Sequence, residues 1–230
     1  MKHLLSALFV LLALASNGQT FKKDLKPFTE LKISRGIEAT LVHSDAQELS
    51  FEVKGINKSD IIIEQDNGRL YIKVKTKALW ESMQEFDWWV KVTIPYQKIK
   101  MIDLATGATV KSAGVIESSN LFIKNKMGAE ADLELKVAKL SVDTSMGSTT
   151  KLEGMAKEVH IDANMGAVVR AFNLKSKYNT VESNMGAVVS VNCDFEFDGS
   201  ASMGGTIKLK GNPENMFMTE TMGAYIVIIE

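Results

Sequence analysis

The sequence predicts an all-β protein whose larger part is a parallel β-helix, and three observations lead to this prediction. The dipeptide Met-Gly recurs every 18 to 20 residues through the second half of the chain. Apolar and polar residues alternate on both sides of each copy, which is the period of a strand. No segment sustains the apolar period of a helix. Self-similarity at about 20 residues indicates a solenoid built from short repeats.

Residues 1–18 are predicted to be a secretory signal peptide. Lys2 precedes an apolar run over residues 4–14, and small residues surround the expected cleavage point after Gly18. The run is shorter than the ~20 residues that a membrane-spanning helix needs. No Cys follows it, so a lipoprotein anchor is not expected. The mature chain is therefore expected to be exported as a soluble protein, whether periplasmic, on the outer surface or secreted, with no transmembrane segment.

Residues 19–100 are predicted to form a strand-rich N-terminal head. Alternating segments lie at 28–33, 37–43, 49–53, 61–64, 70–74 and 90–95. The sequence Asp66-Asn67-Gly68-Arg69 indicates a tight turn, and hence a hairpin between the fourth and fifth of these segments. The sequence leaves open whether the head and the repeats that follow form one continuous domain.

Residues 101–230 are predicted to be the β-helix repeats. A 19-residue unit is too short for a strand-helix crossover or a propeller blade, but it fits one coil of a parallel β-helix. Glycine suits a corner that needs positive φ, and the methionine before it is expected to fill the corner interior as a buried residue. Thr106-Gly107 is a degenerate copy. The predicted corners are Met127-Gly128, Met146-Gly147, Met165-Gly166, Met185-Gly186, Met203-Gly204 and Met222-Gly223.

These features resemble those of the head GIN domain family of putative auto-transporter adhesins, exported β-solenoid proteins found mainly in Bacteroidetes. The resemblance covers nearly the whole mature chain and rests on residues 36–41, 68–72 and 92–95 together with the glycine corners. Family members commonly carry Gly-Ser-Gly where this chain has Met-Gly followed by a small residue. The resemblance implies export and a right-handed β-helix, and it supplies no ligand and no catalytic residues.

Composition bounds the chemistry. The 230 residues carry 27 basic and 28 acidic side chains, so a nucleic acid partner is not expected. The single Cys193 excludes a disulfide framework and is expected to be a small buried apolar residue. Asp143 and Asp162 are predicted to stack between Lys124 and Glu182, but no nucleophile with a base and an orienting group is visible. The chain is therefore predicted not to be an enzyme and to need no cofactor.

Two repeated columns are candidate sites. Stacked thioethers from the corner methionines can hold Cu(I), a soft ion, but the absence of a neighbouring His or a Met-x-x-Met motif favours core packing and no metal. The polar residues two positions before each glycine form either a ligand groove or hydrogen bonds to the turns. They are Lys126, Ser145, Asn164, Asn184, Ser202 and Thr221.

Two further segments are candidate interfaces. All three tryptophans lie within ten residues, and Trp80, Phe86, Trp88 and Trp89 alternate with acidic residues. This segment is either a surface for a glycan or a partner protein, or it packs the head on the solenoid. The last strand, at 225–229, is apolar throughout. Its outward residues Tyr225, Val227 and Ile229 are expected to be covered by the head or by a second subunit, and a homo-oligomer is favoured.

The predicted function is that of a non-catalytic exported β-solenoid, an adhesin or cell-envelope interaction module with a glycan or surface-protein ligand. Two alternatives stay open. One is a carbohydrate-active enzyme of β-helix fold, and the other is a purely structural envelope protein. A groove with converging acids favours the enzyme, whereas flat ladders with an aromatic patch favour binding.

Overall fold

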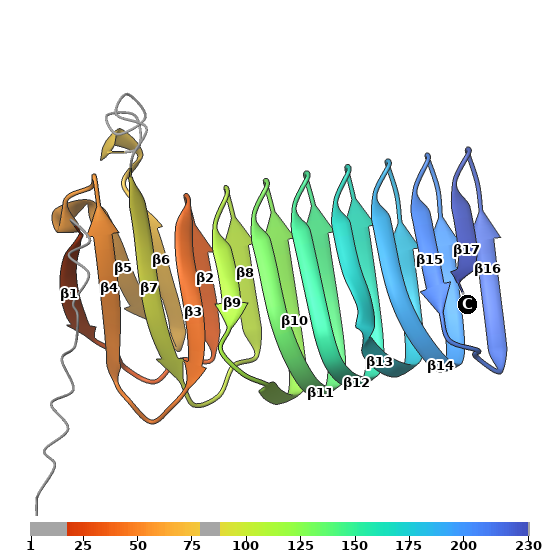
Figure 1. Cartoon of the computed structure of the whole chain (residues 1–230), viewed down its shortest axis with the longest axis horizontal. Coiled ribbons are helices and arrows are strands. Elements are labelled where there is room, and N and C mark those ends of the chain that lie inside the picture. Colours follow the sequence, from red (N-terminus) through yellow and green to blue (C-terminus); the bar gives the residue numbers. More distant parts are fainter. Residues whose placement is uncertain (1–17, 79–87, 230) are drawn as a thin grey trace, which may run out of the picture.

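The computed structural model describes residues 18–78 and 88–229, and its strands, which make up about 70% of the structure, belong to one wound 17-stranded β-sheet (Figure 1). A short 3-10 turn, Lys58–Asp60, precedes β5. The strands are β1 (Gln19–Asp24), β2 (Glu30–Ser34), β3 (Ile37–His43), β4 (Glu48–Lys54), β5 (Ile61–Asp66), β6 (Arg69–Val74), β7 (Trp89–Tyr96), β8 (Met101–Ala105), β9 (Thr109–Ser112), β10 (Ile116–Lys126), β11 (Glu130–Ser145), β12 (Thr149–Asn164), β13 (Val168–Ser183), β14 (Val188–Ala201), β15 (Thr206–Lys210), β16 (Asn215–Glu220) and β17 (Tyr225–Ile229).

The repeats form a β-solenoid of about seven turns, as predicted. Each of the long strands β11 to β14 runs down one face, bends, and returns along the other face to the next tight turn (Figure 1). Neighbouring coils pair in parallel. In the pairing of β11 with β12, Glu130 lies opposite Thr149 and Ser145 lies opposite Asn164. The 19-residue spacing of the sequence is therefore the register of the sheet.

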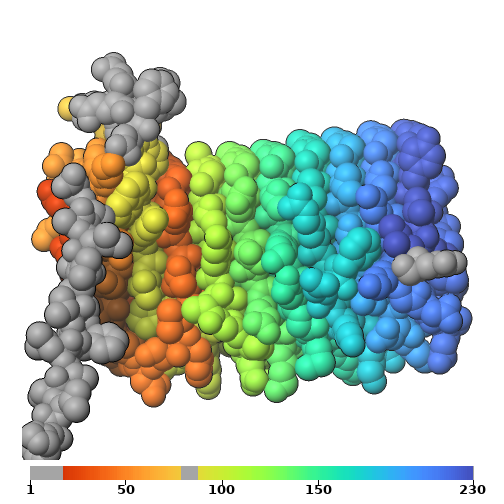
Figure 2. Space-filling model, in the orientation of Figure 1, coloured from red at the N-terminus to blue at the C-terminus, as the bar shows by residue number. Residues whose placement is uncertain are grey.

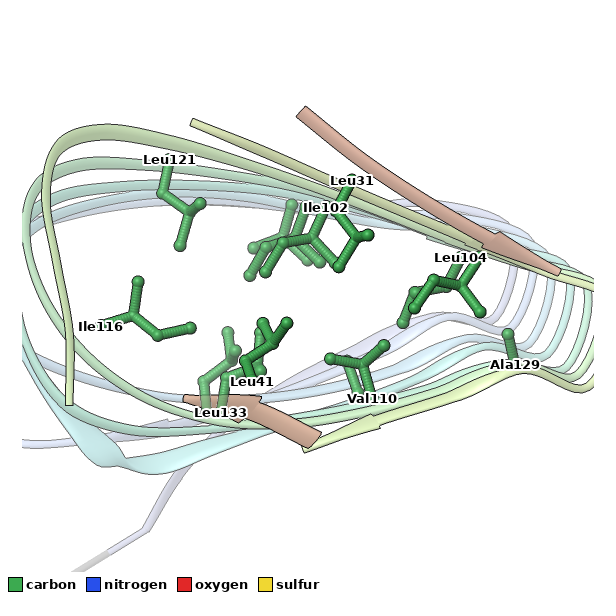
Figure 3. Close-up of a cluster of buried hydrophobic side chains, with 14 of the residues drawn as sticks. Leu31, Leu41, Ile102, Leu104, Val110, Ile116, Leu121, Ala129 and Leu133 are labelled. Carbon is green, nitrogen blue, oxygen red and sulfur yellow. The ribbon is translucent and has the colours of Figure 1, made fainter. Parts of the chain in front are cut away.

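The core lies between the two faces of the flattened coils. Residues five and seven positions before each glycine, and three and five after it, point inward as the alternation predicts, and those of the internal coils are buried. Figure 3 looks along the solenoid and shows Leu121 and Ile116 at the wide end, with Ala129 at the narrow end beside the turns. Each coil buries its apolar residues only against its neighbours, which is how repeat proteins gain stability.

The order of the coils in space differs from their order in the sequence. Strand β2 pairs in parallel with both β6 and β8, and β3 pairs in parallel with both β7 and β9. The coil formed by β2 and β3 is thus inserted between two coils that come later in the chain. Antiparallel pairs occur at the N-terminal end, where β1 pairs with β4, β4 with β7 and β5 with β6. The last of these is the predicted hairpin, with positive φ at Asn67 and Gly68.

Candidate functional site

The Met-Gly pairs occupy the tight turns along the upper edge of Figure 1. Every methionine of the six has a φ between 47° and 56°, and every glycine after it has a φ between 68° and 73°. Two consecutive residues with positive φ define a type I′ turn, the turn that suits the twist of paired strands. Five of the six turns also close on themselves, as in the hydrogen bond from the Ala167 N–H to the Asn164 carbonyl at 3.2 Å.

The prediction that the corner methionines are buried is wrong. We call these six residues the methionine column, and their side chains are between 46% and 77% exposed. The first central residue of a type I′ turn directs its side chain away from the coil. The interior is filled instead by the small residue after each glycine, such as Ala129 or Ser148, which is fully buried. The column consists of Met127, Met146, Met165, Met185, Met203 and Met222.

Hydrogen bonds between coils hold the methionine column in register. The N–H of the glycine in one turn donates to the carbonyl of the methionine in the next turn, at N···O distances of 3.0 to 3.2 Å. These bonds run without a break from Gly107, which donates to Met127, to Gly204, which donates to Met222. The backbone of the tips is therefore as regular as that of the strands. Successive methionines are expected at the ~4.8 Å spacing of a sheet.

Two more turns belong to this row. Thr106-Gly107 has positive φ at both residues, as expected for the degenerate copy. Arg35-Gly36 has the same conformation, and the Gly36 N–H donates to the Thr106 carbonyl at 3.1 Å. This turn was not predicted from the repeat, because Arg35 stands in place of methionine and lies 71 residues before Thr106 in the chain. The one sequence feature that indicated a turn here was Gly36, which directly precedes an alternating segment.

The outward acidic residues are in the predicted register but do not converge on an open site. Asp143 lies opposite Asp162 in neighbouring strands. The Lys126 ammonium is 3.2 Å from the Asp143 carboxylate, and Asn164 donates a hydrogen bond to Asp162. Among residues 18–78 and 88–229, no group of three or more His, Cys, Asp or Glu is arranged to hold a metal ion. In this row Asp143 forms an ion pair with Lys126 of the preceding coil, whereas Asp162 is hydrogen-bonded by Asn164 of its own strand.

The predicted polar column is partly used by the turns themselves. Ser145 is buried, and its carbonyl accepts a hydrogen bond from the Ser148 hydroxyl at 2.7 Å. The Ser202 hydroxyl donates to the Asn184 side chain in the preceding coil. The Lys126 ammonium forms an ion pair with the Asp143 carboxylate. These contacts correspond to the structural interpretation of the column, and its use as a ligand groove stays a prediction.

The aromatic segment is described only in part, because Trp80 and Phe86 lie outside the described residues. Trp88 is half-buried and lies against the Arg35-Gly36 turn, where a Cβ on Gly36 would be 2.7 Å from the indole ring. Trp89 is half-buried too, and the Lys91 ammonium lies 5.0 Å from its ring centroid. The role of this segment as a binding surface stays a prediction.

Cys193 is fully buried, as predicted, and burial raises the pKa of its thiol. The thiol group hydrogen-bonds to the carbonyls of Lys177 and Glu196, at 3.4 and 3.0 Å. A thiol of raised pKa in a closed core is a poor nucleophile and metal ligand. Cys193 therefore contributes to packing.

The C-terminal end of the solenoid is apolar and uncovered. Figure 2 shows the last coil, in dark blue, as one end of the molecule. Strand β16 pairs only with β14, and β17 pairs only with β15, so each presents a free edge. We call the following seven side chains, which are 43% to 77% exposed, the C-terminal apolar surface. They are Met216, Phe217, Met218, Met222, Tyr225, Val227 and Ile228.

The prediction for the last strand described only part of this surface. Tyr225 and Val227 are exposed and Ile229 is intermediate, so the described part of the head does not cover them, and cover by a second subunit stays a prediction. Ile228 was expected to face the core, but it is 50% exposed because no described strand packs over this side of the last coil. The same reason leaves Met216 and Met218 of β16 exposed. The Glu220 carboxylate accepts a hydrogen bond from the Ile226 N–H at 2.6 Å and so satisfies one donor of the free edge.

The N-terminal end has the opposite character. Its edge strand β1 carries Lys22 and Lys23, and Lys22 pairs with Glu48 at 2.7 Å. Phe21 stacks on Phe51 with ring centroids 4.6 Å apart. The Lys58 ammonium lies over the Phe21 ring, 5.5 Å from its centroid. Charged side chains on an edge strand discourage pairing with another chain. Only the C-terminal end combines free strand edges with exposed apolar side chains among the described residues.

Comparison with known proteins identifies the family. Residues 27–213 match the family model described as "Putative auto-transporter adhesin, head GIN domain". The chain belongs to the head GIN domain family. The resemblance inferred from the glycine corners is thereby confirmed, and the head GIN domain spans both the strand-rich N-terminal third and nearly all of the repeats. No curated protein matches the chain.

Solved structures share the fold of this head GIN domain at low sequence identity. A putative adhesin from Bacteroides fragilis superimposes with a TM-score of 0.80 and 19% identity, over 92% of this chain and 97% of that one. A putative lipid binding protein from Parabacteroides distasonis gives 0.71 and 13%, over 94% and 98%. A putative adhesin from Parabacteroides merdae gives 0.68 and 15%, over 93% and 96%. The predicted function class agrees with the adhesin descriptions of the family and of two of these neighbours.

The described part of the chain contains no helix of the length and hydropathy needed to cross a membrane.

Proposed function

We propose that this head GIN domain is an exported, non-catalytic interaction module, and that its C-terminal apolar surface contacts a second copy of the chain. The observation that carries the proposal is the open last coil, where free strand edges and exposed apolar side chains coincide. Exposed apolar patches of this size on a globular protein mark contact surfaces. The adhesin descriptions of the family and its neighbours support a binding role.

The size of the surface suits a stable dimer. At about 200 Å² for a fully exposed large side chain, seven side chains near half exposure offer about 700 Å² per chain. These side chains do not all face along the solenoid axis, because Phe217 lies opposite Asp198 on one face and Val227 lies opposite Lys208 on the other. Two such surfaces therefore bury at most about 1,400 Å² together, and they reach the range of specific interfaces only where each partner also contacts these flanks. Within Asn215–Glu220 and Tyr225–Ile229, Glu220 is the single charged residue. The desolvation cost of joining two such ends is therefore low.

The geometry favours a tail-to-tail contact. The C-terminal end is apolar and the N-terminal edge strand is charged, so the two ends of the molecule do not complement each other in hydrophobicity. A two-fold axis across the C-terminal end reverses the solenoid axis and brings free edges together as antiparallel pairs. Antiparallel pairing satisfies backbone N–H and C=O groups of both edges. A contact between identical surfaces also closes the assembly at two chains.

The mass of residues 19–230 as a function of concentration tests the proposal. We expect the wild type to be dimeric by light scattering, and Tyr225→Lys with Val227→Lys to be monomeric. Both positions face outward, because Val227 lies opposite Lys208 and Tyr225 lies opposite Thr206 in the preceding coil. Since Val227→Lys places two like charges side by side, thermal melting of the double variant checks that it is folded. Val115→Lys is the matched control, since Val115 is similarly exposed in a bend far from this end. The dissociation constant of the dimer should rise at least about tenfold in the double variant and stay unchanged in Val115→Lys.

A wild type that stays monomeric at about 1 mM, a concentration that fills even weak dimers, contradicts self-association. Equal effects of Val115→Lys and of the double variant contradict the assignment of the surface. Capture of a different protein by the wild type, with no dimer, assigns the C-terminal apolar surface to that partner instead.

We also propose that residues 1–18 are removed on export. A positive start, an apolar run of signal-peptide length and small residues before Gln19 support this. Intact-mass measurement of the protein recovered from the exported fraction is expected to give a chain that begins at Gln19 without a lipid. A chain that retains Met1, or one that carries an acyl group, contradicts the proposal.

A further inference from the structure

The methionine column combines two properties that packing and folding do not explain. Its side chains are about half exposed, so they add little to the core. Its residues also have φ near 50°, a left-handed conformation that is unfavourable for an ordinary L-residue and that Asn or Gly adopts more easily. Asn-Gly is the usual pair in such turns. Methionine nevertheless occupies this position in six successive coils.

We propose that the methionine column is a binding site for a soft monovalent metal ion, Cu(I). Thioether sulfur is a soft donor that selects Cu(I) over the harder divalent ions. The side chains that project from the tips of the turns are these six thioethers. A built Cβ at Gly128, Gly147 or Gly166 meets no atom within 4 Å, so the space beside the column is open for an ion.

The spacing of the turns fits a bridging ion. Metal–sulfur bonds are about 2.3 Å long, so one ion joins two sulfurs that are up to about 4.6 Å apart. Parallel coils repeat at about 4.8 Å, and methionine has enough rotatable bonds to close the small difference. The Gly-to-Met hydrogen bonds keep the backbone of the tips in place. Binding therefore orders side chains alone, which limits its entropic cost.

The neighbours of the column favour a monovalent ion. The residues just before the column are Lys126, Ser145, Asn164, Asn184, Ser202 and Thr221. None of these is a carboxylate, and the adjacent Asp143 and Asp162 carboxylates are already engaged by Lys126 and Asn164. Hard ions such as Mg²⁺ and Ca²⁺ need oxygen ligands from carboxylates. The column offers neutral sulfur, which suits a low-charge soft ion.

Calorimetric titration with Ag(I), a redox-stable soft monovalent probe, tests the site. All proteins carry Cys193→Ala, so the thiol does not compete. We expect about two or three ions per wild-type chain, because each ion shares two or three thioethers. Replacing Met146, Met165 and Met185 by Leu should reduce the stoichiometry to about one, since only Met203 and Met222 remain as neighbours. Leucine keeps the apolar surface and removes the sulfur.

The matched control replaces Met101 and Met155, two methionines outside both the column and the C-terminal apolar surface, by Leu. It should bind as the wild type does. X-ray absorption of the Cu(I)-loaded protein should show sulfur neighbours at about 2.3 Å. Unchanged binding by the column variant, equal losses in both variants, or nitrogen and oxygen neighbours at the copper would each overturn the proposal. Thermal melting of each variant establishes that it is folded, and the Met146→Leu, Met165→Leu pair replaces any triple variant that does not fold.

Discussion

In the six Met-Gly turns, the glycine and the methionine differ in how well they suit the left-handed backbone conformation that both adopt. Each glycine needs positive φ and has free space around it, so its role is conformational. Each methionine is in the same left-handed region without the benefit of a missing Cβ. The sequence predicted the glycine correctly from its physical chemistry. It could not predict the exposure of the methionine, because the type of turn decides which way that side chain points, and the alternation of the strands does not reach into the turn.

Met165→Asn tests the cost of the methionine backbone. Asn tolerates left-handed φ and forms the usual type I′ pair with Gly166. The free energy of unfolding by urea should therefore rise by about 0.5–1 kcal/mol. Met155→Asn is the control, because Met155 is an exposed strand residue and Asn has low strand propensity, so this change should give no gain. A loss of stability in Met165→Asn would show that the methionine side chain has a packing role.

At the scale of the elements, the bends opposite the turns depend on close backbone contact. Gly154 lies in β12 with a φ of 104°, and it pairs with Leu135 of β11 and Leu174 of β13. A Cβ at this position would be 2.1 Å from the Leu135 carbonyl oxygen. Glycine is required here by space as well as by φ. Gly211 follows Gly204 by seven residues, as Gly154 follows Gly147, and it is constrained in the same way, with a φ of 100° and a built Cβ 2.2 Å from the Cys193 carbonyl oxygen. The repeat alignment did not reveal this, since other coils have larger residues such as Leu135 and Asn173 at this point.

Gly154→Ala should destabilise the protein by about 3 kcal/mol or more, because β11 and β12 must separate to admit the methyl group. Gly166→Ala should cost only about 1 kcal/mol, since it has the unfavourable φ but no close neighbour. Urea denaturation of both variants compares the two effects directly. Equal costs would mean that β11 shifts freely at Leu135.

Strand boundaries in the elements were predictable where alternation was regular, as in β3, β6 and β7. The inward position of Gly199 departs from the pattern of large apolar residues, and the neighbouring Phe197 explains why. Gly199 stands where other coils have valine or isoleucine, and a Cβ there would be 2.5 Å from the Phe197 ring. The large Phe197 and the small Gly199 together fill the space of two ordinary core residues. A sequence pattern that scores positions one by one treats Gly199 as a defect.

At the scale of the whole molecule, the sequence predicted the solenoid but not the order of its coils. The 19-residue period equals the register between coils, so the repeat region could be predicted directly. The position of β2 and β3 between later coils depends on which edges are left free when β6 and β8 form, and no local pattern records that. Exposure of Met216, Met218 and Ile228 likewise depends on the absence of a further coil. Properties that depend on neighbours far along the chain were the ones missed.

The two ends of the molecule differ in a way that limits assembly. Lys22 and Lys23 of β1 oppose strand addition at the N-terminal end, while β16 and β17 present apolar residues at the other. If both ends were apolar, head-to-tail stacking would give open filaments. The charged N-terminal edge is therefore expected to oppose such stacking.

The hydrogen-bonded row of turns also restricts how such a chain can change in length during evolution. A duplication of one whole coil leaves every glycine opposite a methionine carbonyl, so it is compatible with the fold. An insertion of one or two residues within a turn removes that match for the coils on both sides. The opposite bends tolerate such changes, as the pairing of β13 with β14 shows by passing from Ala171 directly to Lys175. Relatives of this protein should therefore differ at the turns by complete coils and at the bends by single residues.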